Sequence, residues 1–425
     1  MSRIKTAEKN IRNHFIDLEK NQRKFVPGKS KIPLAFPPYN AEEVCEALDS
    51  MVNLQTTMGK KVRKFEREFG KYVGTKYSIM VNSGSSANLL ALSILTNPYL
   101  GNKRIKTNDE IITPAVTWPT TVYPISNVGA VPKFVDVNLD DFSINVDEIE
   151  NAITKKTKAV MLVHLLGNPC DMKKIKKIVK KHDLWLIEDA CEAHGAKYYQ
   201  KHVGAFGDLS TFSFFASHHI TTMEGGMVLT SNKILHELGK SMRTFGWIRD
   251  LSSRKTLEKK YQKIDPRFLF VNTGYNFRPT ELQGAFGIHQ IKKLENLVKI
   301  RIKNVAFLNK KLSPYEEFLI LPKLKKHYRK SFLFYPLTVI KNNYFSKKEL
   351  VNYLEKAGIE TRPVMAGNIL EQPVSKIFKF RKNSKLKNSQ YIMRHSFLIG
   401  NHHRIKEPER EFIANTIIDF INKKT

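Results

Sequence analysis

Short apolar runs rich in β-branched residues alternate with helical patterns between residue 75 and about residue 231. Buried strands separated by helical stretches indicate a mostly parallel sheet with helices on both faces. The pattern therefore predicts an α/β fold around one large, mostly parallel, seven-stranded sheet. The seven predicted strands are residues 77–81, 110–113, 133–137, 159–164, 184–188, 211–214 and 227–229.

The pattern changes beyond Pro279. A helical pattern from Glu281 to Leu312 predicts a long helix that links two domains, and the remainder mixes predicted strands with helices. The first 31 residues carry nine Lys/Arg against three Asp/Glu and only a weak helical pattern. We therefore predict an N-terminal arm (1–35), a large domain (36–285) and a smaller α+β C-terminal domain (286–425) with the linking helix at its start.

Composition excludes several classes of protein. No apolar run of the 425 residues reaches the roughly 18 residues needed to cross a membrane, and no apolar segment follows the first charges as in a secretory signal. The three cysteines, Cys45, Cys170 and Cys191, are odd in number and widely spaced, which argues against a disulfide framework. These features predict a cytoplasmic protein with no membrane contact.

The net charge of +31 raises the alternative of a nucleic-acid-binding protein. However, the lysines are spread along the whole chain, and neither zinc-finger spacing nor an RNA-binding aromatic signature accompanies them. We therefore predict no nucleic-acid partner. A basic surface also suits an anionic substrate that bears phosphate.

Two motifs follow predicted strands, and each could serve either to bind a ligand or only to support the fold. Ser83-Gly84-Ser85-Ser86-Ala87-Asn88 opens a predicted helix, so that its N–H groups and hydroxyls could surround a phosphate, or its serine could simply cap the helix. It is neither a P-loop nor a dinucleotide fingerprint. In Trp118-Pro119-Thr120-Thr121, the indole could stack on a planar ring or belong to the core.

Two further motifs carry titratable side chains. The apolar strand before Asp189 delivers this carboxylate at its end, where it could pair with a protonated pyridine nitrogen or cap the next helix. The segment from Phe212 to Gly226 holds the adjacent histidines His218 and His219. Neighbours in sequence rarely face one metal ion, and no H-x-x-x-H spacing or cysteine partner is present, so we predict no metal site.

Together, the four motifs resemble the DegT/DnrJ/StrS family of sugar aminotransferases and dehydratases, which are fold-type-I pyridoxal phosphate enzymes. The resemblance extends from Thr56-Thr57-Met58-Gly59 through Gly274-Tyr275-Asn276-Phe277-Arg278 to Thr361-Arg362-Pro363-Val364-Met365-Ala366-Gly367-Asn368. It implies a fold-type-I large domain that binds the cofactor, pyridoxal or pyridoxamine 5′-phosphate.

The resemblance also implies a role for each matching residue. Asn276 matches a residue that reaches the cofactor phosphate of a neighbouring subunit, which implies a homodimer with shared active sites. The other implied cofactor-binding residues are Ser85, Ser86 and Ala87 in the phosphate-binding turn, Trp118 stacked on the ring, Asp189 at the pyridine nitrogen, Glu192 at the ring substituent and Ser213 at the phosphate.

His218 stands where most members of the family have the lysine that forms a Schiff base with the cofactor. Imidazole forms no such stable imine, but it is a proton acceptor and donor. With a histidine at this position, the chain resembles the 3-dehydratases of the family. These enzymes make 3,6-dideoxysugars for surface polysaccharides from nucleotide-linked 4-keto-6-deoxy sugars. The resemblance implies that His218 is the catalytic base of such a lyase and that the cofactor is held without a covalent bond.

One branch of these dehydratases carries a two-iron cluster, which needs four thiolates. The chain has three cysteines, so we predict no iron–sulfur cluster and an amino donor such as glutamate as the reductant. Candidate substrate-binding residues are Thr56, Thr57, Met58, Gly59, Arg249 and Arg278.

Two departures from the family pattern concern the site. Met223 replaces a usual glycine, and Phe245 stands where one branch has a substrate-binding arginine. Two alternatives remain open, an aminotransferase that holds its cofactor without a covalent bond and an inactive relative that binds sugar nucleotides.

Overall fold

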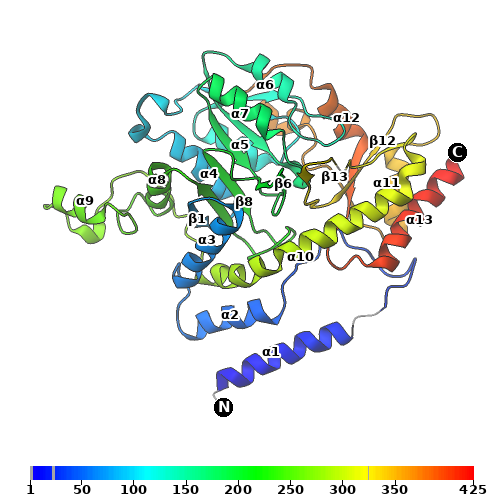
Figure 1. The fold of residues 1–425 in the computed structure, drawn as a ribbon, viewed down its shortest axis with the longest axis horizontal. Helices are drawn as coiled ribbons and strands as arrows, with labels where there is room; N and C mark the ends of the chain where they lie inside the picture. The colour runs from blue at the N-terminus through cyan, green and yellow to red at the C-terminus, as the bar shows by residue number, and fades with distance from the viewer. Residues whose placement is uncertain (1–2, 22–23, 324) are drawn as a thin grey trace.

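The computed structural model describes residues 3–21, 24–323 and 325–425 (Figure 1). The N-terminal helix α1 (Arg3–Lys20) lies at the edge of the molecule beside α2 (Ala41–Val52), and the guanidinium of Arg12 is 3.5 Å from the carboxylate of Glu42. None of the helices in the described part of the chain is long and apolar enough to span a membrane.

The large sheet confirms the seven predicted strands and adds an eighth of two residues. Its order is β1-β9-β8-β5-β4-β2-β3-β14, and every neighbouring pair is parallel except the two pairs that involve β9. The strands are β1 (Tyr77–Val81), β2 (Glu110–Pro114), β3 (Val131–Val135), β4 (Thr157–Val163), β5 (Trp185–Asp189), β8 (Leu209–Ser213), β9 (Gly226–Thr230) and β14 (Arg381–Lys382).

Helices cover both faces of this sheet. Most of its strands are therefore buried on both sides. One core cluster joins α4 and α8 to the strands, a second joins α6 and α7, and a third joins α3 and the start of α10. The helices are α3 (Lys60–Val73), α4 (Gly84–Leu95), α5 (Pro119–Asn127), α6 (Val146–Ala152), α7 (Met172–Lys181), α8 (Lys233–Arg243) and α9 (Arg254–Lys260).

Helix α10 (Glu281–Leu312) matches the predicted linking helix and begins with a capping box between Thr280 and Gln283. Val298 packs in the core beside the large sheet, and Val305, two turns later, packs in the core of the smaller sheet. The one helix therefore joins both cores (Figure 1). The domain boundaries inferred from the sequence stay predictions.

The smaller sheet is antiparallel and has the order β10-β12-β15-β13. It consists of β10 (Leu319–Ile320), β12 (Tyr335–Val339), β15 (Ser396–Ile399) and β13 (Thr361–Pro363), with helices α11 (Lys347–Lys356), α12 (Lys387–His395) and α13 (Glu407–Lys424). A third sheet contains β11 (Tyr328–Arg329), β6 (Lys197–Tyr198) and β7 (Lys201–His202). Short 3-10 helices span Pro98–Lys103, Leu165–Gly167, Pro266–Phe268, Ser313–Tyr315, Ile369–Glu371 and Pro373–Lys376.

Candidate active site

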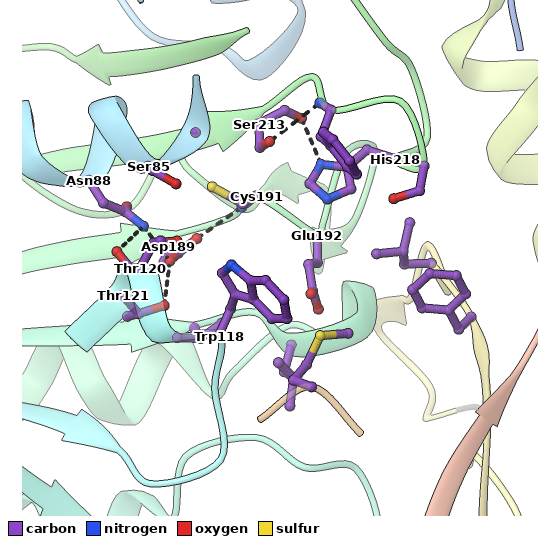
Figure 2. Close-up of a pocket in the computed structure, with 18 of the residues that line it drawn as sticks. Ser85, Asn88, Trp118, Thr120, Thr121, Asp189, Cys191, Glu192, Ser213 and His218 are labelled. Atoms are coloured by element: carbon purple, nitrogen blue, oxygen red, sulfur yellow. Dashed lines mark hydrogen bonds between the residues drawn. The ribbon is translucent and has the colours of Figure 1, made fainter. Parts of the chain in front are cut away.

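A cavity of about 550 Å³ opens at the carboxyl ends of the parallel strands, where open α/β sheets bind ligands. Residues from the smaller sheet and the segment before it, including Leu333, Phe334 and Leu398, close its other side. Six of the residues predicted from the sequence line this cavity, each at the end of a strand or within the segment that follows it: Ser85, Trp118, Asp189, Glu192, Ser213 and His218 (Figure 2).

Asp189 ends β5 and is nearly buried, with 4% of its surface exposed. One of its carboxylate oxygens accepts hydrogen bonds from Asn88 Nδ2 at 2.9 Å and Thr121 Oγ1 at 2.8 Å, and the other accepts from the Cys191 N–H at 3.1 Å (Figure 2). Among the residues that the structure describes, no cationic side chain forms an ion pair with Asp189. A buried carboxylate without a counter-ion fits a ligand that brings a positive charge.

The start of α4 faces Ser213 across a close contact. A Cβ on Gly84 would lie 2.4 Å from Ser213 Cβ, so only glycine lets the helix start approach this strand. The Ser83 hydroxyl accepts a hydrogen bond from the Ser86 N–H at 3.1 Å, which leaves the N–H groups of the first two helical residues for an anion. The helix start, Ser85 and Ser213 thus form a cradle that fits a phosphate group.

The loop after β8 orients His218. Its Nδ1 is 3.0 Å from the carbonyl oxygen of Ser213, and because a carbonyl only accepts, Nδ1 carries the proton. The other ring nitrogen, Nε2, therefore has a free lone pair. The pKa of His218 is lowered to about 4, mainly by burial and to a smaller extent by the positive charge of Arg301, although the bond to Ser213 opposes the shift. His218 is thus a neutral base at physiological pH.

Glu192 contrasts with Asp189 because, within the described part of the chain, it accepts one hydrogen bond, from the Leu166 N–H at 2.8 Å. Burial raises the pKa of Glu192 to about 7, with a smaller contribution from the negative charge of Asp189. Near neutral pH this carboxyl group therefore exchanges a proton easily, and it lies beside the ring of Trp118 in the cavity (Figure 2).

Four of the twelve non-glycine residues with positive φ in the described chain belong to segments that concern the site. Met223, which replaces the usual glycine, has φ 69°, and Phe245, at the second departure from the family pattern, has φ 60°. Leu166, which binds Glu192, and Met365, which lines the cavity, also have positive φ values, of 54° and 47°. This left-handed region disfavours side chains with a Cβ, and such strain concentrates at functional sites.

The remaining predicted residues lie outside the cavity of the single chain. Ala87 is buried in the core and Ser86 lies beside Ser83. Near the start of α10, Thr57 pairs with Thr280 and the Gly59 N–H donates to Glu281. Asn276 pairs with Thr244 and accepts from Arg278, whose guanidinium lies over the ring of Phe245. The guanidinium of Arg249 lies over the ring of Trp247. The functions assigned to Ser86, Ala87, Thr56, Thr57, Met58, Gly59, Arg249, Arg278 and Asn276 stay predictions.

Asn88, Thr121 and Arg362 are three of the cavity residues that had no predicted role. Asn88 holds Asp189 and is itself oriented by the Thr211 hydroxyl at 2.6 Å, and Thr121 supplies the second donor to Asp189. The sequence contained one indication of the role of Asn88, because a polar residue within the apolar helix Gly84–Leu95 must find a hydrogen-bond partner when it is buried. No local pattern distinguishes Thr121, or Arg362 from the smaller sheet, because only the tertiary structure brings them to the cavity.

The sheet, the unpaired carboxylate at its edge, the anion cradle and the 54% exposed indole of Trp118 define a fold-type-I site that fits a pyridoxal phosphate cofactor. Comparison with known proteins agrees with this class. Residues 38–418 match the model of the DegT/DnrJ/EryC1/StrS aminotransferase family. The chain belongs to this family, which confirms the resemblance seen in the sequence.

Individual relatives are similar over most of the chain. The GDP-4-keto-6-deoxy-D-mannose 3-dehydratase of Yersinia pseudotuberculosis is 37% identical over 87% of this chain and 94% of its own length. The lipopolysaccharide biosynthesis protein RfbH of Salmonella typhimurium is 35% identical over 93% of each chain. A crystal structure of GDP-4-keto-6-deoxymannose-3-dehydratase with a trapped PLP-glutamate geminal diamine covers 91% of this chain and 100% of that chain, with a TM-score of 0.85 and 34% identity.

Proposed function

We propose that this chain is a pyridoxal/pyridoxamine phosphate-dependent 3-dehydratase that removes the 3-hydroxyl of a nucleotide-linked 4-keto-6-deoxy sugar. The observation that carries the proposal is His218, which stands at the position of the family's lysine with its free Nε2 in the cavity. The similar 3-dehydratases support the substrate class, and the lipopolysaccharide protein supports a place in surface polysaccharide synthesis.

The residues present would hold the cofactor without a covalent bond. Asp189 would pair with the protonated pyridine nitrogen, Trp118 would stack on the ring, Glu192 would contact its substituent, and Ser85 and Ser213 would bind the phosphate. When bound as the amine, the cofactor supplies the group that captures the sugar ketone and the conjugated ring that accepts electrons.

His218 would move the proton of the elimination. The bond from Nδ1 to Ser213 fixes the tautomer and the ring, so that Nε2 can accept a proton inside the cavity. Its low pKa keeps it unprotonated before the reaction. A lysine at this position could return the proton to the sugar and favour transamination, whereas histidine leaves elimination as the outcome.

Three further elements belong to the proposal. Glutamate would serve as the amino donor, which the PLP-glutamate complex of the similar structure supports. Asn276 would reach the cofactor phosphate of a second copy of the chain in a homodimer. The enzyme would act in the cytoplasm, which its free cysteines Cys45, Cys170 and Cys191 support.

Incubation of the purified protein with pyridoxamine phosphate, glutamate and a panel of nucleotide-linked 4-keto-6-deoxy sugars tests the proposal. Mass spectrometry should show a keto-sugar that has lost the 3-hydroxyl, and the panel identifies the nucleotide. An amino sugar as the main product would instead establish an aminotransferase. Absence of any turnover with intact cofactor binding would favour the inactive relative.

A further inference from the structure

A second cavity lies at the opposite end of the strands that carry the active site. Its volume is about 610 Å³, which is in the range of pockets that hold one small ligand. Asp189 and Ser213, which line the active-site cavity, are the last residues of β5 and β8. The second cavity is lined instead by Trp185, the first residue of β5, and by Asp208, which directly precedes β8. The two cavities are therefore separate sites at the two edges of the large sheet.

The charged side chains along this second cavity are mostly positive. Asp183 and Asp208 line it together with five lysines, and we call it the lysine cavity. Asp183 pairs with Lys103 at 2.6 Å, and the Asp208 carboxylate accepts the Leu186 N–H at 2.9 Å. The five lysines are Lys103, Lys158, Lys176, Lys177 and Lys180. Among the residues that the structure describes, the last four of them form no ion pair, so the lysine cavity holds positive charge that the chain leaves uncompensated.

The fold, and not one run of sequence, brings these lysines together. Lys103 ends the 3-10 helix Pro98–Lys103, Lys158 belongs to β4, and the other three belong to α7. The apolar residues of α7 pack in the core beside the large sheet, which leaves its lysines on the outer side. Lys174 and Lys181 of the same helix do not line the cavity. The excess of lysine in the composition spreads charge over the whole surface, whereas here three distant segments converge on one hollow.

Aromatic residues form part of the wall of the lysine cavity. The Trp185 Nε1–H donates to the carbonyl oxygen of Lys103 at 2.7 Å, and the Lys103 ammonium lies 5.9 Å from the centre of the indole ring. Phe206 also lines the cavity, and the ammonium of Lys201 lies 4.7 Å from the centre of its ring. The pKa of Lys201 is lowered by burial and, to a smaller extent, by the positive charge of Lys176. The lysines thus repel one another, and an anion bound between them would relieve this repulsion.

A compact anion with several charges matches this arrangement. Lysine ammonium groups act as point charges and bind phosphate groups without a fixed geometry. A nucleic acid would instead need an extended basic groove with aromatic side chains on which successive bases stack. We propose that the lysine cavity binds an oligophosphate, a chain of two or three phosphate groups that is either free or part of a nucleotide. This site lies apart from the cofactor and does not depend on the proposed function.

Calorimetric titration with tripolyphosphate tests the proposal on protein loaded with pyridoxamine phosphate, which fills the phosphate cradle and cannot form imines with lysine. The double variant Lys176→Gln/Lys180→Gln should bind tripolyphosphate at least about tenfold more weakly than wild type, because two ammonium groups are lost. The matched control is Lys174→Gln/Lys181→Gln, which removes the same charge from the same helix outside the lysine cavity. It should stay within about twofold of wild type, because solvent and salt screen these more distant charges.

A second titration with ATP distinguishes the two sources of the phosphate chain. Tighter binding of ATP than of tripolyphosphate would identify a nucleotide, and equal affinity would identify the phosphate chain alone, so either result supports the site. The proposal is overturned if wild type does not bind tripolyphosphate, if Lys176→Gln/Lys180→Gln binds it equally well, or if both double variants lose the same affinity, which would reflect net charge alone. A single-stranded RNA oligonucleotide that binds more tightly than ATP would also overturn it, in favour of a nucleic-acid surface. Thermal melting checks that the variants fold, as the exposure of these lysines predicts.

Discussion

Asp189 and Glu192 are three positions apart in the chain and line the same cavity, but their surroundings differ (Figure 2). From the residues that the structure describes, Asp189 accepts hydrogen bonds from two side chains and one backbone N–H, whereas Glu192 accepts one, from the backbone N–H of Leu166. The pKa of the Glu192 carboxyl is raised to about 7, and the pKa of His218, which lines the same cavity, is lowered to about 4.

The difference separates a holding region from a reacting region. The holding region is Asp189 with Asn88 and Thr121, where several donors fix one charged group. The reacting region is His218, Glu192 and the loop that carries Met223, where burial with few partners favours the neutral forms. Proton transfer needs groups whose charge can change, so the sparse hydrogen bonding of the second region suits catalysis.

The largest effect should come from removing the base of the reacting region. His218→Asn should reduce dehydration about a hundredfold to ten-thousandfold, because Asn cannot accept the proton, while cofactor affinity persists through the holding region. Single-turnover rates and cofactor titrations measure the two effects. His182→Asn, at the exposed end of α7, is the control. An undiminished rate in His218→Asn would show that His218 is not the base.

His218→Lys should change how the cofactor is attached. A lysine can form a covalent imine, so borohydride treatment should leave the cofactor bound to the variant but not to wild type. Peptide mass spectrometry identifies the modified residue. A phosphopyridoxyl-lysine in the wild-type digest would contradict noncovalent binding and favour an aminotransferase.

The raised pKa of Glu192 should make stability depend on pH. The carboxyl titrates at about 7 when folded against 4.5 as the ordinary value, so the folded state binds the extra proton between these values. The resulting stabilisation is present below pH 4.5 and is lost as pH rises through 7, a change of roughly 3 kcal/mol. Buried histidines with lowered pKa values, His218 among them, shift stability in the opposite direction in both chains. The loss should therefore appear in urea unfolding at pH 5 and 8 as the difference between wild type and Glu192→Gln. An equal loss in both chains would contradict the assignment, and Glu317→Gln, at an exposed position, is the control.

Substitutions in the holding region should lower the affinity of the protein for the cofactor. Asp189→Asn keeps the size of the side chain and removes its charge, so cofactor binding should weaken about tenfold to a hundredfold. Thr121→Val removes one donor and should cost less, about fivefold to tenfold. Absorbance titration with the cofactor measures both. Wild-type affinity in Asp189→Asn would place the positive end of the cofactor elsewhere.

The smallest effect concerns the strain beside His218. Met223→Gly should stabilise the fold by about 1 kcal/mol, because glycine adopts φ 69° without the steric cost that a Cβ brings. The matched control is Met51→Gly, at an exposed helical position of α2, which should destabilise by about 1 kcal/mol. Urea unfolding should thus give shifts of opposite sign, and equal shifts would show that the loop is unstrained.

Sequence pattern alone predicted much of the fold and part of the site. The seven strands and the helix Glu281–Leu312 follow from local periodicity and capping, which act over a few residues. Asp189 and the turn at Ser85 could be foreseen because each stands at or after the end of an apolar strand, and parallel strands bring their carboxyl ends to one edge. The role of Ser213 was implied only by the family resemblance. His218 was visible as a departure from a known motif.

Only the tertiary structure decided what these groups can do. The order of the strands, the placement of β9 antiparallel to its neighbours, and the approach of Arg362 from the smaller sheet depend on contacts between distant segments. The tautomer of His218 and the pKa of Glu192 depend on one hydrogen bond each and on burial. Burial and three-dimensional neighbours determine whether a side chain is charged, because the cost of desolvation depends on everything packed around it.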